Sequence, residues 1–546
     1  MERYRILLAF VLSFLVLVGY QYLFPPPPPP PGQEQPTPEK APPAPEAPPL
    51  PPAATAPPPV LTTPSDPGRP AREIVVDTDR FRAVFTEAGG QLRSLRLKEY
   101  KASLAPEAPD QELVTTEAAA DLPLAFSWGG EPGPTGVPLL VADRTELPLS
   151  ASQPEGRIVM SGQLPGGLPV TRILSFRNDE YRIDLTVEIG NPGVEPVHGA
   201  PVLALFGRPV SGAQSSYIFN GPAVYLDQSL HEVATKDLAE GAQELTGSVS
   251  WAGYQDHYFL TAMMPASPAG HTARLRLTGQ DLTTILLAGP ADTLAAQASK
   301  RYDYTLFFGP KKLDLLKTVG HDLERVVNFG WFDVLARPTL YLLNWLYGVV
   351  HNYGIAIILV TVLIKLVFWP ISQKGMESMK NMQKIQPKMA KLREKYKSDP
   401  ERLNREMMTL YKTYKVNPVG GCLPMIIQIP VFFALYKVLL QAIELRHAPF
   451  WLWINDLSAP DRLPIGVDIP WLGGIPVLTL LMGASMFLQQ RMTPTSGDPT
   501  QAKIMLFLPV IFTFMFVNFA SGLVLYWFVN NLLAIGQQYL INRKMA

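Results

Sequence analysis

Two kinds of hydrophobic pattern divide the chain: long apolar runs towards both ends, and short alternating runs between them. The first long run covers residues 6–24 and follows Arg3 and Arg5. Its length nearly matches the roughly 20 residues that a helix needs to cross a bilayer. Because the run lacks the Ala-x-Ala-like end of a cleaved signal peptide, residues 1–24 predict a retained signal-anchor helix. The two arginines predict a cytoplasmic N-terminus.

Five further apolar segments lie towards the C-terminus and predict the remaining membrane spans. They cover residues 348–371, 423–443, 475–490, 504–519 and 522–541. The preceding residues, 311–347, are amphipathic and rich in aromatic side chains, which predicts helices that lie at the membrane surface. The pattern therefore predicts an α-helical polytopic membrane protein with six transmembrane helices, five of which form a core within residues 348–546.

Residues 72–310 alternate between apolar and polar positions over short runs. Examples are residues 81–85, 171–176 and 181–189, and Gly, Pro, Asn and Asp separate such runs. Alternation with a period of two is typical of strands with one buried face, so this region predicts an all-β sandwich domain. Residues 25–71 are rich in proline and begin with the unbroken proline run 25–31, which predicts an extended linker without a core.

Charge orients these elements relative to the membrane. Charged residues make up only 17% of the 546 residues, which is below the usual quarter of soluble proteins. The loop at residues 372–416 holds twelve Lys and Arg against five Asp and Glu, whereas the loop at 444–473 holds two against four. The positive-inside rule then predicts a cytoplasmic loop 372–416, cytoplasmic termini and an external β domain.

The sequence offers no candidate for catalysis. It contains no phosphate-binding loop ending in Gly-Lys-Ser/Thr, no His-Glu-x-x-His, no Cys-x-x-Cys and no Gly-x-Ser-x-Gly. Cys422 is the only cysteine, which excludes an intramolecular disulfide and a cysteine-rich zinc site. We therefore predict a protein that is not an enzyme and that uses no cofactor and no metal.

Lys365 is the most informative single residue, because it lies inside a run, residues 355–369, that is otherwise without charge. An ionisable residue at membrane depth indicates a functional site, although a lysine near a helix end can also extend to the membrane surface. Thr361 lies one turn earlier on the same helix face. Gln428 and Trp527 are candidates from other spans for a shared polar pocket. Hydrogen bonding between packed helices is the alternative.

The cytoplasmic loop 372–416 predicts a helical hairpin. Ser398-Asp399-Pro400-Glu401 is a typical helix start, and apolar residues at helical spacing precede and follow it. Its candidate contacts with a client protein or the ribosome are three methionines and two lysines: Met376, Met379, Met382, Lys384 and Lys388. Methionine surfaces adapt to varied apolar partners. Alternatively, the two apolar stripes pack on each other and the lysines form a solvated face.

Several motifs in the C-terminal region resemble the YidC-type membrane protein insertases, the bacterial branch of the Oxa family. They are Asn-Pro-Val-Gly-Gly-Cys-Leu-Pro at 417–424, Gln-Ile-Pro at 428–430, Glu-Leu-Arg-His-Ala-Pro-Phe at 444–450, Asp-Leu-Ser at 456–458 and Ser-Gly-Leu-Val-Leu-Tyr at 521–526. The resemblance covers about residues 330–541. The β domain resembles the large periplasmic domain of Gram-negative members in position and size.

This resemblance implies an insertase and chaperone in the bacterial inner membrane, with a groove open to the cytoplasm and to lipid. Its implied partners are nascent membrane proteins, the lipid bilayer, the Sec translocon with its accessory subunits, and the ribosome. Lys365 stands where the family usually has arginine, and Thr361, Gln428 and Trp527 match groove-facing positions. Only Arg543 and Lys544 follow the last span, so a ribosome contact would need the hairpin.

Two other functions remain open at this stage. A small-solute transporter or channel would also use an ionisable residue among membrane helices, although the spans show no clear internal repeat. A structural envelope-assembly protein would act through the external β domain.

Overall fold

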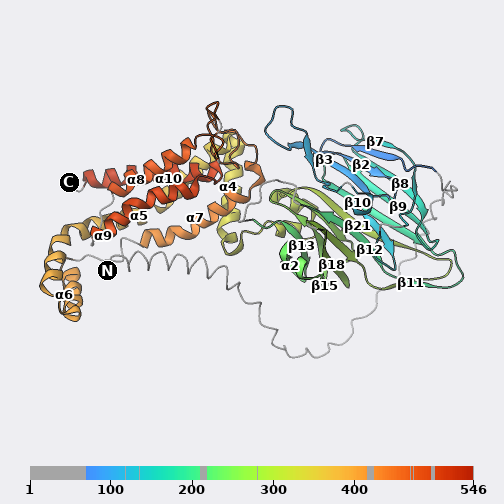
Figure 1. Cartoon of the computed structure of the whole chain (residues 1–546), viewed down its shortest axis with the longest axis horizontal. Helices are drawn as coiled ribbons and strands as arrows, with labels where there is room; N and C mark the ends of the chain where they lie inside the picture. Colours follow the sequence, from blue (N-terminus) through green and yellow to red (C-terminus); the bar gives the residue numbers. More distant parts are fainter. Residues whose placement is uncertain are drawn as a thin grey trace, which may run out of the picture. The chain divides into compact units, whose positions relative to one another are not determined.

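The computed structural model describes residues 69–116, 118–133, 136–208, 218–279, 281–414, 423–467, 469–470, 472–492 and 499–544. The predicted signal anchor at 1–24 and most of the predicted linker at 25–71 lie outside these residues. So do residues 417–422, the first part of the glycine-containing motif. Figure 1 shows strands in the N-terminal part of the described chain and helices in the C-terminal part.

The strands form three larger sheets and one small one. The first sheet has the order β4-β3-β2-β1-β7, the second β14-β13-β16-β17-β21-β10-β9-β8-β6, the third β15-β18-β19-β12-β5, and β11 pairs with β20. The strands are β1 Glu73–Asp77, β2 Phe81–Thr86, β3 Leu92–Lys101, β4 Asp110–Glu112, β5 Ala125–Trp128, β6 Leu140–Ala142, β7 Glu146–Pro148, β8 Glu155–Gln163, β9 Pro169–Arg177, β10 Arg182–Gly190, β11 Val197–Gly199, β12 Pro201–Gly207, β13 Gly221–Leu226, β14 Ser229–Glu232, β15 Gln243–Gly247, β16 Val249–Gln255, β17 Phe259–Pro265, β18 His271–Thr278, β19 Leu282–Ala288, β20 Asp292–Leu294 and β21 Ser299–Pro310. The predicted β-rich region is confirmed.

The burial of β10 shows why the alternating sequence folds in this way. Buried and half-buried positions alternate along its whole length, and its neighbours β9 and β21 pair with it antiparallel. In β16 the apolar positions are nearly continuous, and the strand is buried on both faces. A side chain at Gly253 would place its Cβ 2.2 Å from the carbonyl oxygen of Thr261, so only glycine fits at this position beside β17.

Arg172 ties β9 to the preceding part of the domain. Its Nη1 donates to the carbonyl oxygens of Gly89 at 2.6 Å and Leu124 at 2.9 Å, and the side chain is fully buried. Burial lowers the pKa of this guanidinium to about 10. Burial of an arginine without a carboxylate partner is costly, and the two carbonyl oxygens offset part of that cost. Because the guanidinium needs these acceptors, it fixes the position of the loop at Gly89.

Glu87 is another buried ionic group of the β-rich region, and its carboxylate has no exposed surface. Arg72 donates to Oε1 at 2.7 Å, Arg69 donates to Oε2 at 2.6 Å, and the backbone N–H of Ala142 also donates to Oε1. Burial opposes the charged form of this carboxyl, but the hydrogen bonds from Arg72, Ala142 and Arg69 outweigh burial and lower its pKa to about 2. Glu87 thus connects the start of the domain to β6.

We predict that Glu87→Gln lowers the free energy of unfolding by about 2 kcal/mol at pH 7, because it removes charge-assisted hydrogen bonds. The folded pKa lies below that of an unfolded glutamate, so the stabilisation is complete above the unfolded pKa and is lost as the pH falls towards about 2. Unfolding of the purified full chain in detergent, measured between pH 3 and 7, checks both effects. Glu73→Gln removes an exposed pair with Arg93 and serves as a control with less than about 0.5 kcal/mol of effect. Equal losses in the two variants would contradict the prediction.

The helices follow β21. They are α3 Leu313–Val319, α4 Asp333–Val350, α5 Tyr353–Lys395, α6 Pro400–Thr413, α7 Leu423–Gln441, α8 Val477–Met492, α9 Pro499–Phe516 and α10 Ser521–Lys544, and the short α2 Thr235–Glu240 lies in the β-rich region. Each of the five predicted core spans overlaps one of α5, α7, α8, α9 and α10. Within the described residues, one stretch, Tyr353–Met382, is long and apolar enough to cross a membrane. The count of six spans therefore stays a prediction.

The structure places a helix boundary inside the predicted span 348–371. α4 ends at Val350, His351 adopts a left-handed conformation, and α5 begins at Tyr353. The side chain of Asn352 accepts a hydrogen bond from the N–H of Ile355, which caps the new helix. α5 then continues without a break into the predicted hairpin. The apolar run hid this boundary because it continues through both helices.

Hydrogen bonds from His257 and Arg446 help to connect the β-rich region to the helices. A ring nitrogen of His257 lies 2.6 Å from the carbonyl oxygen of Leu440, in the last turn of α7, where the helix leaves its carbonyls without partners. Arg446 donates to the carbonyl oxygen of Lys101 and to the side chain of Gln111. Burial lowers the pKa of His257 to about 4, so the ring is neutral at pH 7. These contacts hold the end of α7 against the β-rich region.

Candidate functional site

Lys365 lies on the inward face of α5. Its side chain is 7% exposed, and Ile357, Val360 and Thr361 are buried on the same part of the helix. Leu366 and Val367 are 58% and 71% exposed, which identifies the opposite face as the outer one. Lys365 therefore does not extend along the exposed surface of α5. Among the described residues, no charged side chain acts on its ammonium group.

Thr361 lies one turn from Lys365 and is also buried. Its hydroxyl donates to the carbonyl oxygen of Ile357 at 2.6 Å. The donor of this side chain is thus used within its own helix, while its oxygen can still accept a hydrogen bond. The structure brings Thr361 and Lys365 together on one face of α5.

Gln428 and Trp527 take other partners. Nε2 of Gln428, on α7, lies 3.5 Å from Oδ1 of Asn530 on α10, a long hydrogen bond between helices. The ring of Trp527 packs at 4.8 Å from Phe432 and 4.6 Å from Phe516. Neither side chain has a described polar contact with Lys365. For Gln428, the structure gives the interhelical hydrogen bond that was the alternative to a shared pocket.

Further buried polar groups, which the sequence analysis did not single out, lie on α8 and α10. Nδ2 of Asn531 donates to the hydroxyl of Ser485 at 3.0 Å. Nε2 of Gln537 donates to the carbonyl oxygen of Trp369 on α5 at 3.4 Å, while its buried Oε1 has no partner. The signal available in the sequence was the repetition of amide side chains along an otherwise apolar run. Their partners depend on helix packing and could not be read from it.

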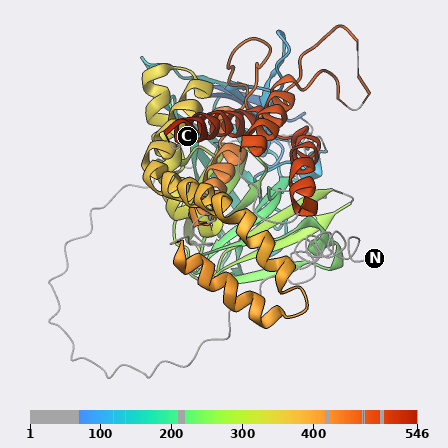
Figure 2. The ribbon, with the colours of Figure 1, turned by 90° about the vertical axis from the view of Figure 1, so that its left-hand side faces the viewer.

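The predicted hairpin forms from the end of α5 and from α6, which lie side by side in Figure 2. Asp399 caps α6 by accepting from the N–H of Arg402, which confirms the predicted helix start. Met382 is buried in the hairpin, in a cluster whose other members are Ile385, Met389, Met407, Leu410 and Tyr411. Packing of the two stripes on each other thus accounts for Met382.

The other predicted contact residues of the hairpin remain more accessible. Met376 and Met379 are half-buried, and Lys384 and Lys388 are exposed. The ammonium group of Lys388 lies 4.3 Å above the ring of Tyr414 and donates to its hydroxyl. Lys384 therefore offers the freer cation of the two.

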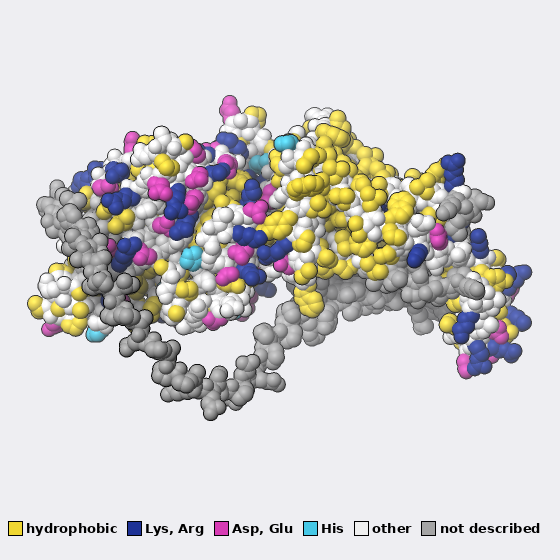
Figure 3. Space-filling model, turned by 180° about the vertical axis from the view of Figure 1, so that it is seen from behind, with side chains coloured by type: hydrophobic (Ala, Val, Ile, Leu, Met, Phe, Trp, Pro, Cys, Tyr) yellow, Lys and Arg dark blue, Asp and Glu magenta, His cyan; other side chains and the backbone are white. Residues whose placement is uncertain are grey.

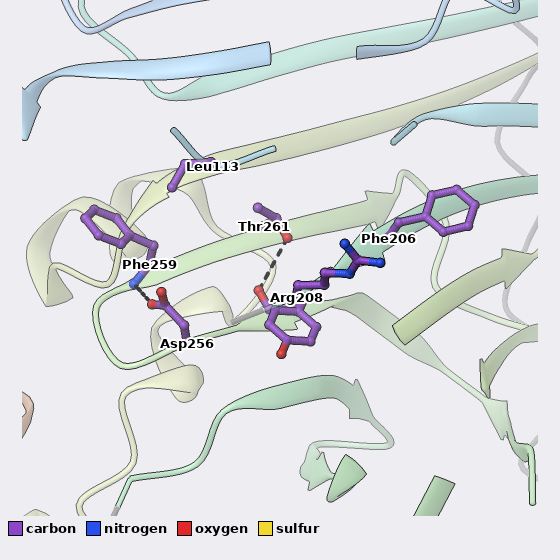
Figure 4. A pocket seen from close by; sticks show the side chains of 8 residues that line it. Leu113, Phe206, Arg208, Asp256, Phe259 and Thr261 are labelled. Atoms are coloured by element: carbon purple, nitrogen blue, oxygen red, sulfur yellow. Dashed lines mark hydrogen bonds between the residues drawn. The ribbon is translucent and has the colours of Figure 1, made fainter. Parts of the chain in front are cut away.

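A separate pocket lies in the β-rich region, away from Lys365. It is small and open to solvent, and its lining includes Arg208, Asp256 and Phe259 (Figure 4). Oδ1 of Asp256 accepts from the backbone N–H groups of Tyr258 and Phe259, while Oδ2 is buried without a partner. Within the described residues, no group of three His, Cys, Asp or Glu side chains could hold a metal ion.

The loop between α7 and α8 is fixed by a buried aspartate. Asp461 is 2% exposed, and its carboxylate accepts from the N–H groups of Leu478 and Thr479 in the first turn of α8 and from Nε1 of Trp453. The residue before α8 is Pro476, whose side chain has no oxygen, so Asp461 supplies the missing cap. The negative charge of Asp461 is also stabilised by the positive end of the helix dipole, at the N-terminus of α8.

We predict that Asp461→Ala lowers the free energy of unfolding by about 2–3 kcal/mol, because two backbone donors and one indole N–H lose their acceptor. Asp461→Asn keeps one side-chain oxygen and should lose about half as much. Thermal unfolding in detergent, followed by tryptophan fluorescence, measures both changes. Equal stability of the alanine variant and the unsubstituted chain would show that the cap contributes nothing.

Taken together, the chain is a membrane-associated helical protein with a large β-rich domain and a buried cation. The family described as 60Kd inner membrane protein matches residues 345–546, and the YidC periplasmic domain matches residues 73–342. The chain belongs to the YidC family. Membership implies an inner-membrane protein with a periplasmic β-rich domain and a helical C-terminal region.

Two curated relatives support this assignment over 88% or more of the chain. A protein of Syntrophobacter fumaroxidans named membrane protein insertase YidC is 42% identical over 562 aligned positions, covering 100% of both chains. A protein of the same name from Syntrophus aciditrophicus is 45% identical and covers 88% of this chain and 87% of its own. A crystal structure described as an active YidC insertase is 20% identical, covers 86% of this chain and 93% of that chain, and has a TM-score of 0.36.

Proposed function

We propose that the chain inserts proteins into the membrane by presenting Lys365 to polar or acidic segments of its clients. Membrane protein insertion is the activity that names its curated relatives, and the interpretation as a transporter or channel does not hold. Insertion, the role that these relatives are named for, is a non-enzymatic one. The observation that supports the proposal best is a buried lysine on the inward face of α5, to which no described residue supplies an opposite charge.

The energetic argument starts from the cost of burying that lysine. A charged side chain among apolar helices is unfavourable unless a partner or water compensates for it. A client carboxylate that approaches Lys365 would supply the missing charge, and the attraction would be stronger there than in bulk water. The client's polar segment would then cross a shorter stretch of the hydrocarbon core without a polar partner.

The driving force for insertion would come from the client itself. Burial of an apolar helix of roughly 20 residues in the bilayer is favourable at about 25 cal/mol per Å² of apolar surface. No nucleotide is needed for such a process. The exposed apolar side chains of α5, which include Leu363, Leu366 and Val367, would face the lipid through which the client enters.

The proposal includes the membrane arrangement predicted from the sequence. The five long helices from α5 to α10, without the hairpin helix α6, and the signal anchor would make six spans with both termini in the cytoplasm. The β-rich domain, with its proposed sandwich architecture, would lie in the periplasm. The hairpin would carry client or ribosome contacts through Lys384 and the half-buried Met376 and Met379. Docking to the Sec translocon completes the proposed partners.

We predict that Lys365→Glu reduces insertion of Sec-independent clients at least tenfold, because it replaces attraction of acidic segments by repulsion. Lys365→Arg should retain most of the activity, since it keeps the charge, and Lys365→Met should fall between them. The measurement is insertion of a radiolabelled client into vesicles that contain each variant at equal amounts. Lys384→Glu, an equivalent charge reversal on the exposed hairpin, is the control for nonspecific effects of charge.

Two outcomes would contradict this mechanism. Unchanged insertion by Lys365→Glu would remove the cation from the pathway. Equal loss in Lys365→Glu and Lys384→Glu would show that total charge matters rather than the buried position.

We further predict that a photo-crosslinker at Thr361 captures the polar segment of an arrested client, and that one at Val367 does not. The two positions lie on the same helix, but the first is 2% exposed on the inward face and the second is 71% exposed on the outer face. Crosslinkers at Gln428 and Trp527 test whether these positions share the path. Equal capture at Thr361 and Val367 would argue against a defined inward route for polar segments.

A further inference from the structure

A short turn between α7 and α8 presents two apolar side chains to the exterior. The N–H of Phe450 donates to the carbonyl oxygen of Ile454, and the N–H of Ile454 donates to that of Trp451. Trp451 is 58% exposed and Leu452 is 86% exposed. Leu452 also has a φ of 59°, a left-handed conformation that is unfavourable for a leucine. The turn thus combines backbone strain with exposure of apolar surface.

The neighbouring residues show that this exposure is not a general property of the loop. Trp453 turns inward, where its Nε1 donates to Asp461, and Ile454 is buried. Both ends of the turn are therefore fixed, and the backbone directs Trp451 and Leu452 outward. An exposed apolar tip on a fixed support is typical of a surface that contacts another phase or molecule.

Contacts with α5 show where the turn lies along the membrane normal. The ring of Phe450 covers Gly354, where an added Cβ would lie 2.0 Å from the nearest ring atom. Nδ2 of Asn352 donates to the carbonyl oxygen of Phe450 at 3.3 Å. Gly354 is the second residue of the stretch Tyr353–Met382, the described stretch that is long and apolar enough to cross a membrane. The turn therefore lies level with the end of a membrane span.

The surroundings favour lipid over a protein partner. Residues 448–455 contain no Asp, Glu, Lys or Arg, so the tip carries no charge for pairing with another protein. Trp345 and Val349, in the last turns of α4 before α5 begins, are 65% and 63% exposed and add further apolar surface. Figure 3 shows apolar side chains gathered over the helical region, and tryptophan is enriched where a bilayer meets water.

We propose that Trp451 and Leu452 insert into the lipid–water interface at the end of the bilayer where α5 begins. There the lipid removes both side chains from water and compensates for the strained turn. The turn then fixes the depth of α5, because Phe450 and Asn352 connect the two. This proposal goes beyond the proposed function: it requires no role for Lys365 and does not depend on which side of the membrane the turn occupies.

The single native cysteine makes a direct test possible in the full-length chain. In a Cys422→Ser background, Leu452→Cys is labelled with the environment-sensitive dye NBD and reconstituted into phosphatidylcholine–phosphatidylglycerol vesicles. Val194→Cys is the matched control, since Val194 is 88% exposed and lies in the β-rich domain. We expect blue-shifted emission at position 452 and at least threefold stronger quenching by headgroup-region nitroxide lipids than at position 194.

Iodide quenching distinguishes the remaining outcomes. If iodide quenches both positions equally and nitroxide lipids quench neither, the tip is in water and the proposal is wrong. If position 452 is protected from both quenchers, a protein surface covers it, and the proposal is again wrong. Trp451→Cys provides an independent second position, so that a folding defect of one labelled variant does not decide the result.

Discussion

The burial of one lysine side chain among apolar helices is the constraint on which the site depends. The other polar groups of the bundle are largely satisfied in pairs: Gln428 with Asn530, Asn531 with Ser485, and Thr361 with its own helix. Such pairs compensate for the loss of water and hold helices together. Lys365 differs because no described group compensates for its charge. Hydrogen bonding therefore explains many of the polar residues in the bundle, and it leaves Lys365 as the charged residue that a client could pair with.

The two ends of the helical region are stabilised by different interactions. In the loop between α7 and α8, Asp461 caps α8, and Arg462 donates to the carbonyl oxygen of Val517 and to Asn518. The N–H of Ser521 donates to the carbonyl oxygen of Ala459, which joins this loop to the start of α10. The hairpin is instead held mainly by isoleucine, methionine, leucine and tyrosine side chains that pack on one another, with one hydrogen bond from Lys388 to the hydroxyl of Tyr414. Directional bonds therefore dominate in the loop between α7 and α8, whereas apolar packing contributes most in the hairpin.

The sequence predicted the types of element better than their contacts. Period-two alternation was sufficient to predict strands such as β10, because one face of each such strand is buried. It could not predict that Arg172 would cross to Gly89, since that contact depends on how sheets pack. The boundary at His351 was missed because the apolar run continues through it, although Asn352 is a good cap. Lys365 could be singled out as a candidate because one charge stands out in an apolar run, whereas the pairing of Asn531 with Ser485 depends on how α8 and α10 pack.

The identity of the buried cation limits what the site can recognise. A guanidinium offers five donors in a planar fork and orients a carboxylate, whereas the ammonium of Lys365 is a compact charge with three rotatable donors. With the neighbouring hydroxyl of Thr361 donating to Ile357, few fixed groups remain to orient a bound carboxylate. Recognition at this position would then depend on the sign of the charge rather than on the geometry of the partner. A site of that kind suits clients whose polar segments share acidity but differ in sequence and conformation, as the substrates of a general insertase must.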